Sequence, residues 1–433
     1  MKLYSTNNTS LRVSFKEAIF NSLPSDKGLY MPTHIPRLTP DFIENIAHYS
    51  FPQIAFHVAE SLLEGAIPSH DLKKIIDDAI NFDAPLVSLN SNTAVLELFH
   101  GPSLAFKDFG ARFMSRVMSY FLEDEAQKLN ILVATSGDTG GAVALGFLNV
   151  PNTQVTILFP KGKVSPIQEM QLTTHGQNIH AIAIDGTFDD CQALVKQAFT
   201  DPELHAKFRL TSANSINIAR LIPQTFYYFY AYTQVQKQEK RDVIFSVPSG
   251  NFGNIAAGLL AWKMGLPVKQ FLAATNSNDT IPAFLNTGIY QPKPTIQTYS
   301  NAMDVANPSN WVRIMDLFAH DMSALKKIVG GYTFSDDTTI RAIHQLYNDH
   351  QYIVCPHTAI AWLALKEWQA KNQTQAVGIF LSTAHPCKFP TVFPDQLVTH
   401  IKIPKQVEEL KSRTSKAVTL SKHFDDFKAN MML

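Results

Sequence analysis

A single lysine set among small and apolar residues is the strongest chemical signal in this sequence. It is Lys107, in the stretch from His100 to Gly110. Residues 95–99 are typical of a strand, and apolar residues at helical spacing follow from 109 to 121, so Lys107 is predicted on a strand-to-helix turn. Partial burial beside apolar neighbours lowers the pKa of a lysine, which leaves a neutral amine able to attack a carbonyl. Lys107 therefore has the character of a Schiff-base lysine. The plain alternative is a surface lysine that pairs with Asp108.

A second signal is the glycine-rich run Ser-Gly-Asn-Phe-Gly-Asn at residues 249–254. It lies between a predicted strand at 243–247 and a helix that continues to residue 264. Glycines let backbone N–H groups turn toward one point, and a helix N-terminus adds partial positive charge. The loop is predicted to hold a phosphate, with Gly250, Asn251, Phe252, Gly253 and Asn254 as its binding residues. For this motif alone, an ordinary structural turn is the alternative.

The run Thr-Ser-Gly-Asp-Thr-Gly at residues 135–140 has the same position after a predicted strand, and more hydroxyl groups. Hydroxyl donors and free N–H groups suit a carboxylate, so Thr135, Ser136 and Thr139 are candidates for holding the α-carboxylate of an amino-acid substrate. An ordinary N-cap formed by Asp138 or Thr139 explains the loop equally well.

Two further polar positions follow later in the chain. Asn214, Ser215 and Arg220 offer an amide, a hydroxyl and a bidentate donor near a predicted helix start, which suits a second phosphate or carboxylate. A surface arginine is the alternative for Arg220.

Thr383 ends the last predicted strand, where its hydroxyl can hydrogen-bond a pyridine nitrogen without protonating it. A threonine that caps a turn is the alternative there.

These polar loops depend on an alternating pattern of strands and helices. Predicted strands at 131–134, 155–159, 179–184, 243–247, 271–275 and 376–381 alternate with helical segments, which is typical of a parallel sheet covered on both faces. In such sheets ligands bind beyond the carboxyl ends of the strands. Because the loops at 135–140, 249–254 and 382–386 all follow strands, they are predicted to meet in one cleft. Residues 1–85 instead show helical spacing at 15–20, 50–64 and 70–80, which predicts a mostly helical N-terminal domain.

Composition favours a small-molecule partner. The 433 residues carry a formal net charge of zero and are 17% charged, below the roughly 25% of an average soluble protein. There is no basic stripe or acidic tail, which argues against nucleic acid and membrane surfaces. The chain has 3 cysteines without metal-ligand spacing, so no metal site is predicted. Reduced thiols and the lack of an apolar N-terminal segment predict a cytoplasmic protein.

Together these motifs resemble the threonine synthase family of pyridoxal-phosphate enzymes, which has the tryptophan-synthase-β-like fold (PLP fold type II). The resemblance covers nearly the whole chain, from Tyr-Ser-Thr at residues 4–6 to residues 382–389. Asn7, where the family often has an arginine, and Cys387, in place of a small residue, depart from the pattern. The resemblance implies an N-terminal domain at 1–85 and two interleaved α/β domains at 86–433, the smaller at about 105–220.

The resemblance also implies a cofactor and roles for the site. Pyridoxal 5′-phosphate is expected on Lys107, with its phosphate at 250–254 and its ring nitrogen facing Thr383. Asp138 is expected near the cofactor, and substrate contacts are expected from the residues named above: Thr135, Ser136, Thr139, Asn214, Ser215 and Arg220. His385 and Lys388 are interpreted as structural or rim residues.

The function implied is conversion of O-phospho-L-homoserine and water to L-threonine and phosphate, by a monomer or homodimer. Two alternatives stay open from the sequence. One is another reaction on the same fold, such as a serine or threonine dehydratase or a β-replacement synthase, whose substrates lack a γ-phosphate. The other is a non-catalytic homologue that binds a phosphorylated ligand, and the lysine at 107 argues against it.

Overall fold

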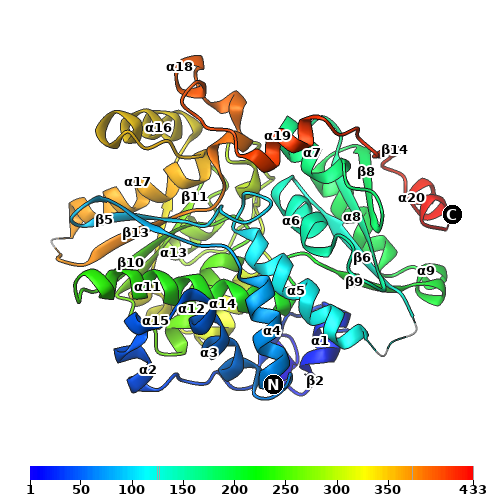
Figure 1. Cartoon of the computed structure of the whole chain (residues 1–433), viewed down its shortest axis with the longest axis horizontal. Coiled ribbons are helices and arrows are strands. Elements are labelled where there is room, and N and C mark those ends of the chain that lie inside the picture. The colour runs from blue at the N-terminus through cyan, green and yellow to red at the C-terminus, as the bar shows by residue number, and fades with distance from the viewer. Residues whose placement is uncertain (124, 126, 373, 433) are drawn as a thin grey trace.

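The computed structural model describes residues 1–123, 125, 127–372 and 374–432. Two α/β lobes lie side by side, and the N-terminal helices lie along one edge of the pair (Figure 1). We call them the larger lobe, built on a six-stranded sheet, and the smaller lobe, built on a five-stranded sheet. Among the helices of the described residues, none is both long enough and apolar enough to cross a bilayer.

The N-terminal region combines helices with a small antiparallel sheet of strand order β2-β1-β3. Its elements are β1 (Lys2–Ser5), β2 (Arg12–Ser14), α1 (Phe15–Asn21), β3 (Tyr30–Pro32), α2 (Pro40–Glu44), η1 (Ile46–His48), α3 (Phe51–Leu63) and α4 (Ser69–Ala79). Helix α1 begins where it does because the Ser14 hydroxyl accepts from the Glu17 N–H while the Glu17 carboxylate accepts from the Ser14 N–H. The helices predicted at 15–20, 50–64 and 70–80 are present as α1, α3 and α4.

The larger sheet has the strand order β12-β11-β10-β13-β5-β4. Its strands are β4 (Leu86–Asn90), β5 (Thr93–Glu97), β10 (Val243–Pro248), β11 (Gln270–Thr275), β12 (Val329–Thr333) and β13 (Val377–Ser382). All neighbours are parallel except the edge strand β4, which pairs antiparallel with β5. The helices and 3-10 turns along this part of the chain are α10 (Ile218–Leu221), η2 (Ile222–Thr225), α11 (Phe226–Gln238), α12 (Gly253–Lys263), α13 (Thr280–Thr287), η3 (Asn301–Met303), α14 (Trp311–Leu317), α15 (Met322–Ile328), α16 (Asp336–His350), α17 (Pro356–Lys371), η4 (Pro386–Lys388), η5 (Pro390–Val392) and α18 (Asp395–Val398).

The smaller sheet is parallel throughout, in the order β14-β8-β7-β6-β9. Its strands are β6 (Leu129–Ala134), β7 (Thr153–Pro160), β8 (Ile179–Asp185), β9 (Arg209–Ser212) and β14 (Val418–Ser421). The helices of this lobe are α5 (Lys107–Leu122), α6 (Asp138–Phe147), α7 (Pro166–Thr173), α8 (Phe188–Ala198), α9 (Pro202–Lys207), α19 (Lys405–Lys411) and α20 (Phe424–Met432). The chain therefore returns to this lobe at its C-terminal end.

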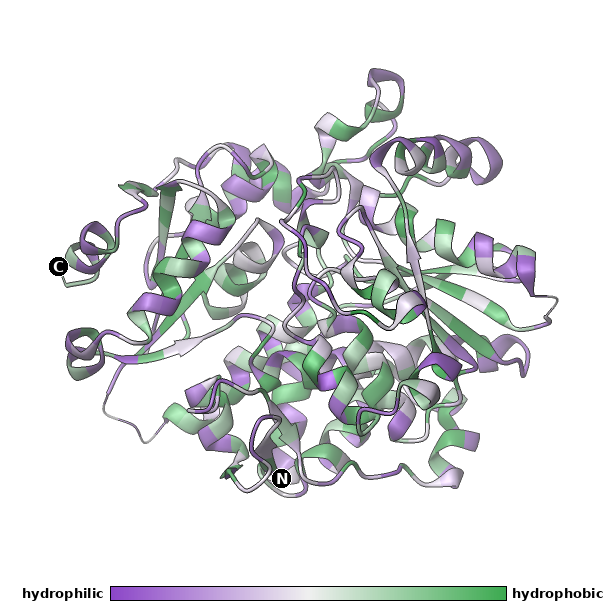
Figure 2. Ribbon diagram, turned by 180° about the vertical axis from the view of Figure 1, so that it is seen from behind, coloured by the Kyte–Doolittle hydropathy of each residue, from purple (hydrophilic) through white to green (hydrophobic). Residues whose placement is uncertain are grey.

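The central strands are apolar because both faces of each sheet are covered. Every residue of β6, β10 and β13 is buried. In Figure 2 the strands of the larger sheet are mostly green, whereas the outer helices carry purple stretches. One core cluster includes residues from both lobes and from the N-terminal helices, such as Val58, Val133 and Phe245. This shared packing holds the strand ends of the two lobes against each other.

The turn that carries Lys107 is held against the end of β13. Ala105 and Ala384 form an isolated antiparallel bridge, the Phe106 N–H donates to Thr383 O at 2.9 Å, and the His385 N–H donates to Leu104 O at 3.0 Å. The segment after β13 thus positions the segment before α5. The two segments are far apart in the chain, since Ser103 in one and Lys388 in the other are separated by 285 positions.

Candidate active site

A cavity of about 1100 Å³ lies where the polar loops meet. Its lining includes residues from both lobes and from the N-terminal region. Every residue predicted from the sequence to bind cofactor or substrate is part of the lining: Lys107, Thr135, Ser136, Asp138, Thr139, Asn214, Ser215, Arg220, Gly250, Asn251, Phe252, Gly253, Asn254 and Thr383. The predicted meeting of the loops in one cleft is therefore observed.

Lys107 is the first residue of α5 and is partly buried, with its Nζ 5.8 Å from the centre of the Phe106 ring. Burial lowers the pKa of Lys107 to about 8, opposed by the Asp138 carboxylate and assisted by Arg220 and Lys388. Within the described chain its ammonium group has no hydrogen-bond or ion-pair partner. The alternative pairing with Asp108 does not occur, because that carboxylate accepts from the Ser103 N–H at 2.9 Å.

The loop at 250–254 presents its backbone to the cavity. Phe252, at the N-cap of α12, has φ of +59°, which turns the chain in the left-handed sense. The backbone N–H groups of residues 250–254 donate to no other group in the part of the chain described here. Side chains hold the loop from behind, since the Asn254 amide donates to Pro248 O at 2.8 Å. The loop has the free donors that an anion requires.

Close packing against residues 302 and 303 explains the glycine at 250. A Cβ on Gly250 would lie 2.7 Å from Ala302 O and 2.7 Å from Met303 Cα, both backbone atoms. The Ala302 N–H donates to His357 Nε2 at 3.2 Å, which fixes that segment. His357 is buried, and burial lowers its pKa to about 4, so it acts as a neutral acceptor.

A second set of hydrogen bonds ties the loop to the segment at 214–220. Ser215 Oγ accepts from the Asn251 amide at 2.6 Å and from the Asn310 amide at 3.2 Å. Arg313 is fully buried and donates to Asn310 Oδ1 at 2.7 Å and to Ile216 O at 2.6 Å. These bonds connect the loops on either side of the cavity.

Arg220 adds a buried positive charge to the cavity wall. Its Nη1 donates to Ala213 O, while its Nε is buried without a partner among the described residues. Burial lowers the pKa of Arg220 to about 10, which leaves the guanidinium charged at neutral pH. The surface-arginine alternative is excluded, because the residue is 3% exposed. A buried cation in the wall of a cavity suits an anionic ligand.

Some polar groups of the loop at 135–140 form hydrogen bonds within the loop itself. Thr135 Oγ1 accepts from the N–H groups of Gly137 and Gly140, at 2.9 Å each. Gly137 has φ of +134°, which only glycine adopts readily, and a Cβ there would lie 2.4 Å from the Gln168 amide carbon. Thr135 is buried, while Ser136 and Thr139 are partly exposed toward the cavity.

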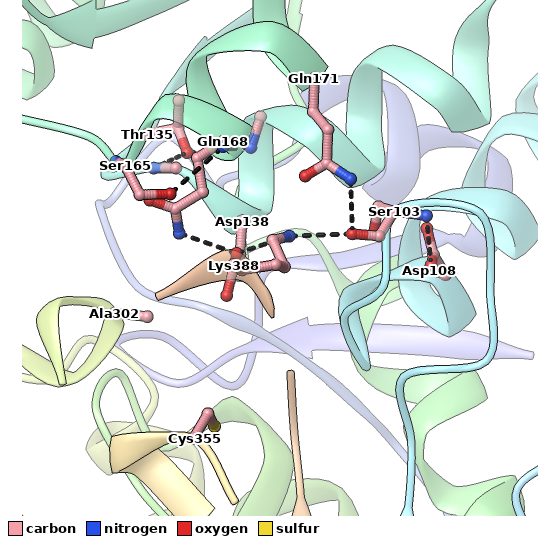
Figure 3. A network of polar contacts seen from close by, with 12 residues as sticks. Ser103, Asp108, Thr135, Asp138, Ser165, Gln168, Gln171, Ala302, Cys355 and Lys388 are labelled. Atoms are coloured by element: carbon pink, nitrogen blue, oxygen red, sulfur yellow. Dashed lines mark hydrogen bonds and ion pairs between the residues drawn. The ribbon is translucent and has the colours of Figure 1, made fainter. Parts of the chain in front are cut away.

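Asp138 forms a buried ion pair that sequence analysis did not anticipate. Lys388 Nζ lies 2.7 Å from Asp138 Oδ1, and the Gln168 amide donates to the same oxygen at 2.9 Å (Figure 3). Burial alone would raise the pKa of the Asp138 carboxyl, but Lys388 and Lys107 hold it well below its usual range. Lys388 is fully buried, so it is not a rim residue.

Thr383 lies at the end of β13 and is 5% exposed. Its backbone carbonyl accepts from Phe106, and its hydroxyl has no hydrogen-bond partner within the described residues. It lines the same cavity as Lys107. A hydroxyl with spare donor and acceptor capacity therefore faces the space beside the amine.

Comparison with known proteins identifies the family. Residues 82–381 match the family described as pyridoxal-phosphate dependent enzyme, residues 2–80 the threonine synthase N terminus, and residues 358–430 the threonine synthase C-terminal region. Threonine synthase from Serratia marcescens is 45% identical over 405 residues, which cover 94% of this chain and 93% of the relative. The chain belongs to the threonine synthase family.

Solved structures agree with this family. The crystal structure of threonine synthase from Escherichia coli superimposes with a TM-score of 0.92 at 42% identity, covering 100% of this chain and 99% of that one. A structure of PLP-bound threonine synthase from Brucella melitensis gives a TM-score of 0.90 at 34% identity, over 99% and 98% of the two chains. The predicted family, its type II fold and its threonine synthase activity are thereby confirmed, with pyridoxal phosphate as the cofactor.

The residues that line the cavity fit the cofactor on chemical grounds. The cavity supplies an uncompensated amine at Lys107, free N–H groups at 250–254 and a hydroxyl at Thr383. These suit an aldehyde, a phosphate and a ring nitrogen respectively. Sequence reasoning missed His357 and Arg313 and left Lys388 unassigned. Of these three residues, only Lys388 had a sequence signal, because it lies five residues after Thr383 in the last polar loop.

Proposed function

We propose that this protein converts O-phospho-L-homoserine and water to L-threonine and phosphate, with Lys107 as its catalytic base. One observation carries the proposal. The amine of Lys107 is partly buried, has no ion-pair partner in the described chain, and lines the same cavity as the loop of free N–H groups and the buried Arg220. An amine so placed serves covalent and proton-transfer chemistry on an anionic substrate.

The cofactor supplies, when bound, an electron-withdrawing ring that stabilises negative charge at the substrate α-carbon. Lys107 would attach the aldehyde carbon through its Nζ, residues 250–254 would hold the phosphate of the cofactor, and Thr383 would serve its ring nitrogen. Asp138 lies near the cofactor at the start of α6. Its carboxylate is already neutralised by Lys388, so it adds little net charge there.

Lys107 then moves the protons. As a free amine, Lys107 would take the α-proton and would also be the candidate to remove the β-proton, which lets phosphate leave from the γ-carbon. A proton returns to the γ-carbon, water adds at the β-carbon, and a proton returns to the α-carbon. A pKa of about 8 suits both taking and returning protons at neutral pH.

The remaining loops orient the substrate. Arg220, with Asn214 and Ser215, binds the substrate phosphate and stabilises it as it departs, because its guanidinium is a charged donor in the wall of the cavity. The partly exposed side chains of Ser136 and Thr139, with the buried Thr135 behind them, hold the α-carboxylate. The substrate of a serine or threonine dehydratase carries no γ-phosphate. A buried arginine in the cavity wall therefore favours the phosphorylated substrate over a dehydratase substrate.

Organisation of the chain is part of the same proposal. Residues 1–85 form an N-terminal domain, and residues 86–433 form two interleaved α/β domains, the smaller at about 105–220. The two separate sheets support two α/β domains, but β14 belongs to the smaller sheet, so the smaller domain also takes in C-terminal residues beyond 105–220. The protein works in the cytoplasm as a monomer or homodimer, and its three cysteines, all free and buried, are consistent with a reducing compartment.

The decisive experiment compares two products. The purified enzyme with pyridoxal phosphate should release inorganic phosphate from O-phospho-L-homoserine and form threonine, with far slower formation of keto acid from threonine. After borohydride reduction, peptide mass spectrometry should find the cofactor on Lys107. The Lys107→Ala variant should lose both signals, whereas Lys73→Ala, at an exposed lysine, should keep them. Keto acid as the main product, or the cofactor on another lysine, would contradict the proposal.

A further inference from the structure

A buried network joins the turn before Lys107 to the loop at 135–140. Lys388 lies at its centre: its Nζ is 2.7 Å from Asp138 Oδ1 and donates to Ser103 O at 2.8 Å. The Gln168 amide donates to Asp138, and the Gln171 amide donates to Ser103 O, each at 2.9 Å. Figure 3 shows Lys388 between the two loops, with both glutamines reaching toward them.

We propose that Lys388 is a positioning residue which neutralises Asp138, so that this carboxylate does not become the ion-pair partner of Lys107. The inference rests on the function proposed above, because it concerns the amine assigned there. Lys388 itself has no place in the cavity lining, so it acts through Asp138 and Ser103 and not by direct contact with a ligand.

Burial makes the neutralisation necessary. Asp138 and Lys388 are 3% and 0% exposed, so water screens neither charge. Lys107 and Asp138 line the same cavity, and the carboxylate attracts the Lys107 ammonium. Lys388 and Lys107 are the two cations that lower the pKa of Asp138, so without Lys388 the carboxylate would be left with Lys107. An ammonium held in an ion pair cannot attack a carbonyl.

Other charged and titratable groups around Lys107 do not replace this contact. Those that face it from the neighbouring elements are Asp138 on α6, Arg220 on α10, Lys388 on η4 and His357 on α17. Arg220 and Lys388 disfavour the ammonium form, and only Asp138 favours it. The balance therefore depends on how strongly Lys388 engages Asp138.

The geometry of the turn gives Lys388 its second role. Ser103 O accepts from both Lys388 and Gln171, while the Ser103 N–H donates to Asp108. The peptide groups on either side of Ser103 are thus held by charged or amide side chains. Leu104 follows with φ of +59°, a conformation that a free turn would leave readily. Lys388 therefore fixes the turn from which Lys107 extends.

The test measures the pKa of Lys107 directly in the full-length chain freed of cofactor. Competitive amine acylation across a pH series, read by peptide mass spectrometry, gives the labelling midpoint of Lys107, with exposed Lys73 as internal reference. Lys388→Met should raise this midpoint by about one pH unit. Cofactor capture at pH 7, followed by visible absorption, should slow by about tenfold, since one pH unit is a tenfold change in neutral amine.

Matched variants separate charge from structure. Lys388→Met with Asp138→Asn removes both charges, so the midpoint should return to near the native value. Lys388→Arg keeps the cation and should shift the midpoint little. Asp138→Asn alone should lower the midpoint below native, and this variant decides the question if Lys388→Met does not fold.

Two results would overturn the inference. An unchanged midpoint in Lys388→Met that is accompanied only by lower thermal stability would make Lys388 purely structural. A midpoint of Asp138→Asn at or above the native value would show that the carboxylate does not hold the ammonium form. Either result leaves the proposed function intact. By contrast, a native chain that never attaches pyridoxal phosphate to Lys107 contradicts the proposed function.

Discussion

The loops at 135–140 and 250–254 have the same place in their lobes and similar sequences, yet they use their polar groups differently. Each connects a fully buried strand to the N-terminus of a helix. In the larger lobe, all backbone N–H groups from 250 to 254 stay free among the described residues. In the smaller lobe, Thr135 takes up those of Gly137 and Gly140, and Asp138 is paired with Lys388.

The difference shows that a glycine-rich turn becomes an anion site only when its own side chains leave the donors free. Asn251 points its amide away to Ser215, so nothing within the loop competes for the N–H groups. The Thr135 hydroxyl does accept from N–H groups of its own loop. That loop therefore has fewer free donors and a more rigid shape. We expect the first loop to bind the doubly charged phosphate and the second to orient a smaller group.

The largest effect should come from filling the space at Gly250. Gly250→Ala places a methyl group 2.7 Å from two backbone atoms, which cannot move aside as a side chain can. The affinity for pyridoxal phosphate, measured by absorption titration, should fall about 100-fold, or about 2.7 kcal/mol. Gly253→Ala is the matched control, because its Cβ would meet side-chain atoms and no backbone, the nearest being Asn310 Nδ2 at 3.4 Å. Equal losses in both variants would mean that packing at 250 does not set the loop.

Thr135→Val should act on stability before it acts on the cofactor. It leaves two buried N–H groups without their acceptor, so the free energy of unfolding should drop by about 2 kcal/mol in urea titration. Thr135→Ser keeps the hydroxyl and should lose less than half as much. If Thr135→Val instead lost cofactor affinity with unchanged stability, the two loops would bind in the same way and the comparison would fail.

Charge offers a third way to sharpen the comparison, since only the loop at 135–140 carries a carboxylate. That carboxylate, Asp138, is paired with Lys388. Burial lowers the pKa of Lys107 to about 8. A lysine with a lowered pKa gains neutral amine as the pH rises through that value. The rate of cofactor capture should therefore rise about tenfold between pH 7 and pH 9 and then level off. A flat stopped-flow profile across this range would contradict the role assigned to the amine.

The smallest effect concerns the tie between the loop at 250–254 and the segment at 214–220. Ser215→Ala removes an acceptor shared by two amide groups at the cavity wall, where water can partly replace it. The Michaelis constant for O-phospho-L-homoserine should rise about fivefold, or about 1 kcal/mol, with a smaller change in turnover. Ser309 is an exposed neighbour whose backbone N–H donates to Asn251 Oδ1. The control variant Ser309→Ala should leave the Michaelis constant near the native value.

Much of the architecture could be predicted because it depends on local patterns. The strand-to-helix turn at Lys107, the alternation of strands and helices, and the position of the polar loops at strand ends are all readable from periodicity and glycine placement. The strand β14 could not be predicted. It lies far along the chain from β8, its partner in the smaller sheet, and two of its four residues are exposed, so it has no buried-strand pattern.

The sequence by itself determined which chemistry the protein can do, because an apolar setting for a lysine and glycine loops after strands are properties of neighbouring residues. Only the tertiary structure decided the charge state of the site. The partners that decide it, Lys388 and Asp138, are both buried. Desolvation makes such contacts strong, but it depends on burial, and burial is a property of the packed chain and not of any short segment.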